Sequence, residues 1–330
     1  MARRRRSQRP VTWPVLLIVA AVVVGWWVWP ADQQRQAEPI DTPAVQDVAP
    51  APAETEGPRM AAPVVPVAQP ALAPTPTNPE ITEQARSRVA AAEESLKNND
   101  VIAARTTFNH ALGKGLPADQ EARIRSRLGE LALQTVFSPS HVPGDPLTGR
   151  YVIQRGDKLV KIGERFKITD NLLARVNGIT NKNTIRAGQV VKVIHGPFHA
   201  VVFKSQFRVE VYLQDLLVGE YSAGLGADDG TPTGQWRIKD KLVNPTYYPP
   251  RGGQVIAADD PNNPLGERWL GLEGISGEAK GQLRYGIHGT VEPESIGKNV
   301  SLGCIRLHNK DVEMLFDLLV VNDSVVTIRR

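Results

Sequence analysis

The sequence predicts a multidomain chain in which a helical segment, a small mixed unit and a mainly-β domain follow an N-terminal membrane-spanning helix. Its 330 residues exceed the roughly 100–200 of one domain, so two or three domains are expected. The hydrophobic period changes along the chain, from three- and four-residue steps to alternation. A long apolar run also lies between a basic tail and a proline-rich stretch, which indicates a membrane anchor followed by a linker.

Residues 1–10 form a basic tail whose five arginines outweigh the chain's net charge of +4, so the remainder carries about −1. A basic tail on a nearly neutral body argues against a nucleic-acid-binding surface. Residues 11–29 would span ~28 Å as a helix, about one hydrocarbon core, and carry tryptophans at both ends. We therefore expect a single-pass protein of the cell membrane, with the tail in the cytoplasm and the rest in the periplasm or outside the cell. An uncleaved anchor is favoured over a cleaved signal peptide, because bulky Trp26–Trp29 occupies the place of a cleavage site.

Residues 30–80 are rich in proline and alanine and cannot bury enough apolar surface to fold, so we expect a disordered linker. Residues 81–137 turn helical, with breaks at Asn98–Asp100 and Gly113–Pro117. The third helix is expected to bury Ile124, Leu128, Leu131 and Leu133. The spacing resembles one tetratricopeptide-like repeat with a capping helix, so a structural helical hairpin and a surface for a protein partner both stay open. A Pro/Gly linker is expected at residues 138–150.

Residues 151–195 predict a compact βααβ unit. A strand at 151–154 and a Gly-Asp turn lead into a helix with Leu159, Ile162 and Phe166 on one face, then a helix at 170–176 and a strand at 185–193. The phrases YVIQRGDKL, LLARVNG and IRAGQVVKV resemble the LysM domain, apart from a lysine where the family commonly has threonine. The resemblance implies that glycan strands containing N-acetylglucosamine bind in a groove formed by two loops. The residues it places there are Gly156, Asp157, Lys158, Leu159, Asn183 and Ile185.

Residues 198–330 alternate apolar and polar side chains, as hairpins with one buried face do, and one helix is expected around 311–319. The chain's single cysteine, Cys304, lies here. A lone cysteine in an exported chain is accidental, pairs between molecules, or is reactive, and its neighbours must decide. His288 lies in the same Gly-rich region and is a candidate base for the thiol. Gly303 leaves room for a substrate carbonyl near backbone N–H donors, and Arg306 suits a carboxylate-bearing substrate.

The runs H-G-T at 288–290, S-I-G-K at 295–298 and S-L-G-C-I-R-L at 301–307 resemble the signature of YkuD-type L,D-transpeptidases. That resemblance implies a β-sandwich-like domain with short helices, acting on peptidoglycan stem peptides without a metal or organic cofactor. Cys304 would form a thioester with the stem, His288 would take its proton, and the carbonyl of Gly289 would orient the imidazole. A second stem peptide would then resolve the thioester into a 3→3 cross-link. The resemblance places Arg306, Ser301, Gly303, Thr290 and Trp269 around the substrate or its loop.

Many relatives carry a second histidine two residues before the cysteine, where this chain has Leu302, so His288 is the only base in the motif. The sequence leaves the acyl acceptor open. Water would make the protein an L,D-carboxypeptidase, and a protein amine would make it an enzyme that attaches proteins to the wall. A non-catalytic wall-binding scaffold is a further alternative, which the intact Cys304, His288 and Arg306 disfavour.

Overall fold

The computed structural model describes residues 79–250 and 252–330. The predicted membrane span at 11–29 and the predicted linker up to residue 78 lie outside these residues. Within the described ranges, no helix has both the length and the apolar character needed to cross a membrane.

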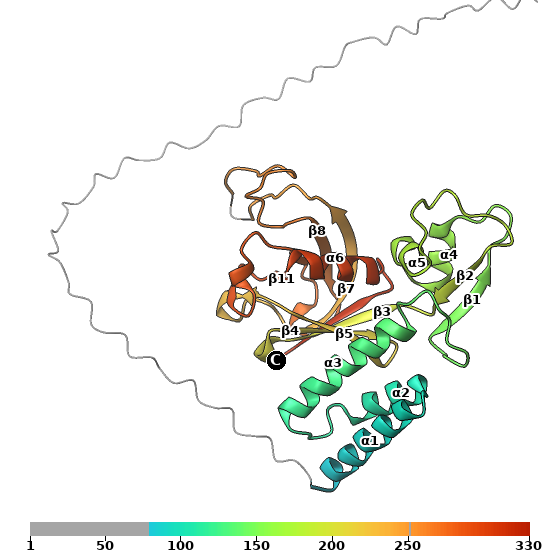
Figure 1. The fold of residues 1–330 in the computed structure, drawn as a ribbon. Helices are drawn as coiled ribbons and strands as arrows, with labels where there is room; N and C mark the ends of the chain where they lie inside the picture. The colour runs from blue at the N-terminus through green and yellow to red at the C-terminus, as the bar shows by residue number, and fades with distance from the viewer. Residues whose placement is uncertain (1–78, 251) are drawn as a thin grey trace, which may run out of the picture. The chain divides into compact units, whose positions relative to one another are not determined.

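Three helices open the described chain, in the positions that the sequence breaks predicted (Figure 1). Asp100 starts the second helix by accepting a hydrogen bond from the N–H of Ala103 at 2.9 Å, and Pro117 precedes the third. The prediction for Leu133 was wrong, because this side chain is 62% exposed. The third helix instead buries the stripe Ile124, Leu128, Leu131, Ala132 and Thr135. The helices are α1 (Pro79–Lys97), α2 (Val101–Ala111) and α3 (Ala118–Thr135).

Helix α3 packs against strand β5 (Leu216–Ser222) of the C-terminal domain as well as against α2. Arg125 of α3 reaches across to Glu220 of β5, with 3.1 Å between Nε and Oε2. Because α3 packs against α2 on one side and β5 on another, the packing favours a structural role for these helices over a docking surface for a partner.

The segment 138–150 is not the free linker that its Pro and Gly residues predicted. Asp145 is fully buried and forms a bidentate ion pair with Arg105 of α2, with N–O distances of 2.8 and 3.1 Å. Arg105 also donates to the hydroxyl of Thr135 at 2.7 Å. On the other side, Lys192 donates to the carbonyls of Thr135 and Ser138 at 2.6 and 2.8 Å. These bonds join the helices to the unit that follows.

That unit has the predicted βααβ order. Its two strands pair antiparallel, with Tyr151 opposite Val191. Strand β1 begins at Thr148, three residues before the predicted start, since Thr148 itself pairs with Ile194. Helix α5 docks on the C-terminal domain through Asp317, which accepts from Asn171 at 2.9 Å and pairs with Arg175. The elements are β1 (Thr148–Val152), α4 (Leu159–Phe166), α5 (Asp170–Val176) and β2 (Val190–Ile194).

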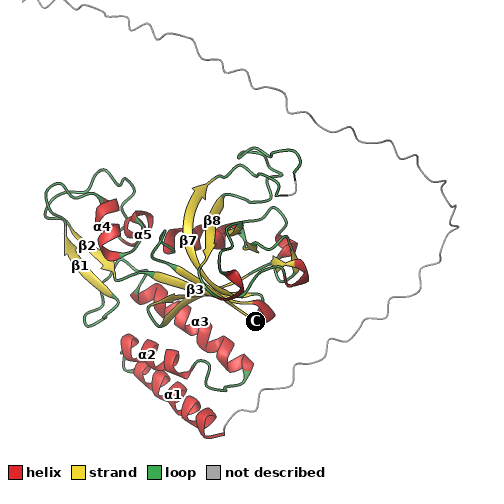
Figure 2. Cartoon of the chain, turned by 180° about the vertical axis from the view of Figure 1, so that it is seen from behind, coloured by secondary structure: helices red, strands yellow, loops and turns green. Residues whose placement is uncertain are grey.

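The C-terminal domain is mainly β, as predicted, but its strands form one eight-stranded sheet in the order β11-β9-β8-β7-β12-β3-β4-β5. A small parallel pair, β6 and β10, lies beside it. β7 and β8 bend strongly along their length (Figure 2), and the register of their pairing shifts between Ile238 and Asp240. A curled single sheet thus replaces the expected sandwich. The remaining strands are β3 (Phe198–Phe203), β4 (Arg208–Leu213), β6 (Leu225–Gly226), β7 (Gly234–Val243), β8 (Arg268–Gly274), β9 (Tyr285–His288), β10 (Asn299–Ser301), β11 (Ile305–Arg306) and β12 (Val325–Arg329).

Helix α6 (Asn309–Leu318) packs against β8 and β9. Val312 and Leu315 enter the core, where Leu270 and Ile287 of the sheet are also buried. At its C-terminal end, the ammonium of Lys241 donates to the carbonyls of Phe316 and Leu319, which the helix leaves open. α6 is therefore fixed at that end, while its first residue lies beside the His288 turn.

Candidate active site

The register between β9 and β11 brings the cysteine and histidine segments together. The two strands are parallel and pair Ile305 with Ile287 and Arg306 with His288, so Cys304 falls beside Gly286. Side chains alternate between faces along a strand. Ile305 and Ile287 therefore enter the core, while Cys304, Arg306 and His288 share the opposite face.

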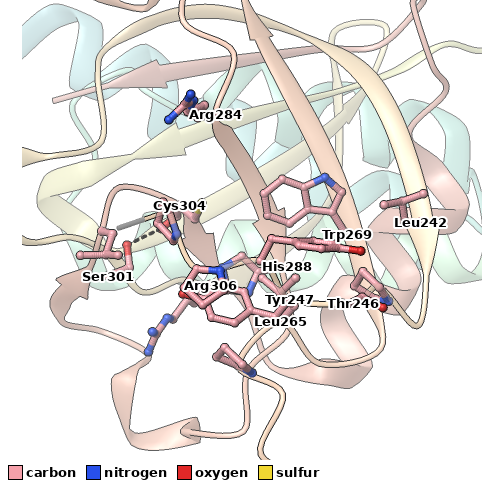
Figure 3. Close-up of a pocket in the computed structure, with 16 residues that line it drawn as sticks. Leu242, Thr246, Tyr247, Leu265, Trp269, Arg284, His288, Ser301, Cys304 and Arg306 are labelled. Atoms are coloured by element: carbon pink, nitrogen blue, oxygen red, sulfur yellow. Dashed lines mark hydrogen bonds between the residues drawn. The ribbon is translucent and has the colours of Figure 1, made fainter. Parts of the chain in front are cut away.

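A pocket of about 550 Å³ opens on that face (Figure 3). Cys304, His288, Trp269, Arg306 and Ser301 contribute to its wall. Aromatic and apolar residues also line it, namely Tyr247, Tyr248, Pro249, Pro250, Leu265 and Leu302. A second, smaller hollow, lined by Gln282, Arg284 and Leu302 among others, also reaches Cys304. Cys304 thus lines both hollows.

The imidazole of His288 is buried and held in one tautomer. Its Nδ1 lies 2.6 Å from the carbonyl oxygen of Gly289, and a carbonyl only accepts, so Nδ1 carries the proton and Nε2 is left as a base. The pKa of His288 is lowered to about 4, mainly by burial; the bond to Gly289 opposes this shift and the nearby Arg306 charge adds to it. The ring is therefore neutral at pH 7 and able to take a proton.

The Cys304 thiol is neutral in the resting state as well. Burial raises its pKa, and this outweighs the backbone of Gly286 and the charge of Arg306, which both lower it. A hydrogen bond that lowers a thiol's pKa must be donated to the sulfur, so the Gly286 N–H faces it. The pair rests as thiol and imidazole, and proton transfer accompanies attack.

Trp269 sets the position of the imidazole. The two rings stack at 21° with centroids 5.8 Å apart, and the indole N–H donates to Asp240 at 3.2 Å. Gly286 makes room for this indole, because a Cβ there would lie 2.4 Å from a ring carbon of Trp269. Trp269 is thus a wall of the cleft held by Asp240, a residue that no sequence motif singles out.

The pattern of the family described as L,D-transpeptidase catalytic domain matches residues 197–328, and that of the LysM domain matches residues 151–193. Putative L,D-transpeptidase YkuD of Bacillus subtilis is 34% identical, with 54% of this chain and 98% of that protein covered. Putative L,D-transpeptidase YqjB of the same organism is 39% identical, with 40% of this chain and 71% of that protein covered. The chain belongs to the L,D-transpeptidase family. Both resemblances noted in the sequence are confirmed.

A solved L,D-transpeptidase from Mycobacterium tuberculosis is 17% identical, with 44% of this chain and 63% of that chain covered and a TM-score of 0.33. The chain thus spans a little under two thirds of that structure, and a TM-score of this size adds nothing to the assignment.

The loop that carries Cys304 is fixed by two buried hydroxyls. Ser301 donates to the carbonyl of Cys304 at 2.6 Å and accepts the N–H of Gly303 at 3.1 Å. Thr231 donates to the carbonyl of Gly303 at 2.9 Å. The N–H of Gly303 is therefore in use, and a Cβ at this glycine would meet Tyr285 at 2.7 Å. A side chain at Gly303 would collide with Tyr285, so Gly303 shapes the loop and Ser301 holds it.

The expected contact of Thr290 with substrate is not supported, since Thr290 is buried and outside the pocket wall. Its N–H donates to the side-chain oxygen of Asn309 at 2.9 Å, and its hydroxyl accepts the N–H of Glu292 at 2.9 Å. The same Asn309 oxygen lies 2.0 Å from where a Cβ on Gly289 would be. Asn309, which the motif analysis missed, thus packs directly on the turn that orients His288.

Arg306 lies between the pocket and Glu292, to which its Nη1 donates at 2.7 Å. Its Nε is buried and has no hydrogen-bond partner among the described residues. Arg306 thus contributes to the pocket wall while Glu292 holds its guanidinium from the other side.

The residues predicted for the LysM groove divide into three groups. Leu159 is only 2% exposed and belongs to the core, which corrects its assignment to the groove. Asp157 accepts from Tyr151 and from the N–H of Gln154, both at 2.8 Å, so it fixes the loop. Gly156, Lys158 and Asn183 are exposed and Ile185 is half-buried, so these four remain available at the surface.

Within residues 79–250 and 252–330, no group of three His, Cys, Asp or Glu side chains is placed to hold a metal ion.

Proposed function

We propose that this protein forms 3→3 cross-links between peptidoglycan stem peptides, with Cys304 as nucleophile and His288 as base. The observation that carries the proposal is the tautomer of His288. Its Nδ1–H is committed to Gly289, so Nε2 is free in the pocket that Cys304 also lines.

In the first half-reaction, Cys304 Sγ attacks the carbonyl of the third residue of the stem, and its proton passes to His288 Nε2. The tetrahedral adduct then expels D-alanine, whose amine takes that proton, and a thioester remains. In the second half-reaction, the side-chain amine of another stem attacks the thioester carbonyl. It loses its proton through His288 to the departing Cys304 sulfur, so the enzyme is restored.

The guanidinium of Arg306 lines the pocket and is suited to a carboxylate or carbonyl of the bound stem. The two hollows that meet at Cys304 leave room for a peptide on each side. Both features fit a reaction with two peptide substrates better than hydrolysis alone.

We further propose that residues 11–29 anchor the protein in the cell membrane, that the remainder lies outside the cytoplasm, and that the LysM domain binds glycan strands. The apolar run behind an arginine-rich tail supports the first two points. A weak glycan contact would raise the local concentration of stem peptides around a tethered enzyme.

The test incubates the full chain in detergent with tetrapeptide muropeptides and analyses the products by mass spectrometry. Dimers formed with loss of D-alanine, and absent with Cys304→Ala, support the proposal. Release of D-alanine without dimers identifies a carboxypeptidase instead. Unchanged muropeptides together with binding to insoluble wall identify a non-catalytic scaffold.

A further inference from the structure

Beyond the N-terminal tail, positive charge is concentrated in the LysM domain. Residues 151–194 hold nine Lys and Arg against three Asp and Glu, a net charge of +6, which exceeds the +4 of the whole chain. A net positive charge of this size on a small domain indicates an anionic partner, provided that the cations are not neutralised by other groups of the protein.

Six of the nine cations are accounted for within the protein. Lys192 is buried against backbone carbonyls, and Arg165 lies over the rings of Tyr151 and Phe166. Two more pair with carboxylates of the catalytic domain, Arg175 with Asp317 and Lys167 with Asp323. A further two pair within the LysM domain, Lys161 with Glu164 and Lys182 with Asp170.

The other three cations, Arg155, Lys158 and Arg186, are exposed and have no carboxylate within ion-pair distance in the described part of the chain. We call these three residues the basic edge.

The basic edge is a local cluster, because its two loops are joined by backbone hydrogen bonds. The N–H of Gly188 donates to the carbonyl of Ile153 at 2.8 Å, and the N–H of Ile153 donates to the carbonyl of Gln189 at 2.9 Å. Asp157, the acid within these loops, is committed to Tyr151 and to the backbone of Gln154. The three charges are therefore not compensated locally.

We propose that the basic edge binds the free carboxylates of peptidoglycan stem peptides, so that the LysM domain recognises an anionic glycopeptide and not the neutral sugar chain alone. This inference rests on the proposed function, since it extends the predicted LysM groove, formed by the same two loops. Stem carboxylates are favoured over other anions because the domain is docked through Asp317 on the catalytic unit whose substrate carries them. A contact of this kind is screened by salt, unlike the stacking of sugars on apolar surface.

The test measures co-sedimentation of the full chain in detergent with three insoluble polymers. These are peptidoglycan, peptidoglycan whose carboxylates have been methyl-esterified, and chitin. Arg155→Gln, Lys158→Gln and Arg186→Gln are combined in one variant. The matched control combines Lys114→Gln, Lys239→Gln and Lys280→Gln, which removes three exposed lysine charges outside the LysM domain.

We expect the basic-edge variant to bind peptidoglycan about tenfold more weakly than wild type, as three exposed charge contacts would predict. Esterification should weaken wild type by a similar factor, rising salt should weaken it further, and the control variant should bind normally. Equal binding to native and esterified wall, or equal binding by the two variants, would overturn the inference. So would loss of binding when phosphate-bearing polymers are stripped from the wall while its carboxylates stay intact.

Cross-linking of soluble tetrapeptides is measured on the same samples. A variant with only Arg155→Gln and Arg186→Gln should retain the wild-type rate, because neither residue lies in the pocket or among the predicted groove residues. If wild type makes no dimers yet binds wall through carboxylates, the proposed function fails and the recognition of carboxylates stands.

Discussion

The side-chain oxygen of Asn309, the first residue of α6, accepts the N–H of Thr290 at 2.9 Å and packs on Gly289. Gly289 supplies the carbonyl that fixes the proton on Nδ1 of His288. Asn309 at the start of α6 thus positions the turn that fixes the tautomer of His288. Asn309 itself lies outside the pocket wall.

Asn309→Ala is expected to lower kcat for cross-linking by about 10- to 100-fold with little change in KM, because misplacement of a catalytic group acts on the chemical step. Asn309→Asp keeps an acceptor for Thr290 and should recover most of the rate. Its added negative charge should move the acid limb of the pH–rate profile upward. Lys310→Ala, one residue along α6 and exposed, is the control and should match wild type. An Asn309→Ala enzyme with wild-type kcat would contradict the positioning role.

The acid limb of kcat/KM for wild type is expected near pH 4, well below the ordinary histidine value, because burial lowers the pKa of His288 to about 4. Activity should therefore persist at pH 5.5, where an ordinary histidine would be mostly protonated. Initial rates between pH 3.5 and 8 measure this. A limb near pH 6.5 would show that the imidazole is solvated in the working enzyme.

The same shift links folding to pH. Because the pKa of His288 is lower in the folded state, the unfolded chain binds more protons between about pH 4 and 6.5, so stability is lost as pH falls through this window. The contribution is at most about 3 kcal/mol. Urea unfolding at pH 7 and 5 should show a loss in wild type that is smaller in His288→Gln. An equal loss in both would place the acid sensitivity elsewhere.

Arg105→Met is expected to destabilise the protein by about 3–5 kcal/mol, because it leaves Asp145 buried without its partner. The double variant Arg105→Met with Asp145→Leu should recover much of that loss, since neither charge then remains buried. Midpoints of urea unfolding give both values. Arg123→Ala, which breaks an exposed pair with Asp119, is the control and should change little. A double variant as unstable as Arg105→Met would mean that packing, not charge, sets the cost.

Gly286→Ala is expected to reduce cross-linking by about 100-fold, because its methyl group would displace the indole that stacks on His288. Gly281→Ala is unsuitable as a control because its φ is +81°. Gly129→Ala in α3, where a Cβ meets nothing within 4 Å, should leave activity unchanged. If Gly286→Ala kept full activity, the position of Trp269 would be irrelevant to the base.

The sequence predicted most local elements of this fold, because their signals are local. Helix α5 has the predicted bounds, since Thr169 before it and Asn177-Gly178 after it mark both ends. The single curled sheet could not be predicted, since the parallel pairing of β11 with β9 depends on contacts that no hydrophobic period encodes. The burial of Asp145 could not be predicted either. Its Pro- and Gly-rich surroundings indicate a linker, but Asp145 is buried in an ion pair with Arg105.

The candidate site likewise contains residues that the sequence identified and residues that it did not. Cys304, His288 and Gly289 stand in a recognisable motif, and their roles were stated from resemblance. Asp240 and Asn309 carry no such signal, because each acts through a neighbour that only the folded chain supplies, Trp269 for the first and Thr290 for the second. Thr290 and Leu159 show the converse, since a place in a motif does not decide whether a side chain faces ligand or core.

The neutral resting state of Cys304 also bears on how long the enzyme lasts. Peroxides and disulfides react with thiolates far faster than with thiols, so a cysteine whose pKa is raised by burial oxidises slowly. An enzyme built on a preformed thiolate would need a reductant to keep it working in an oxidising environment. With Cys304 as the proposed nucleophile, the anion is needed only during turnover, so this cysteine is expected to resist oxidation between turnovers.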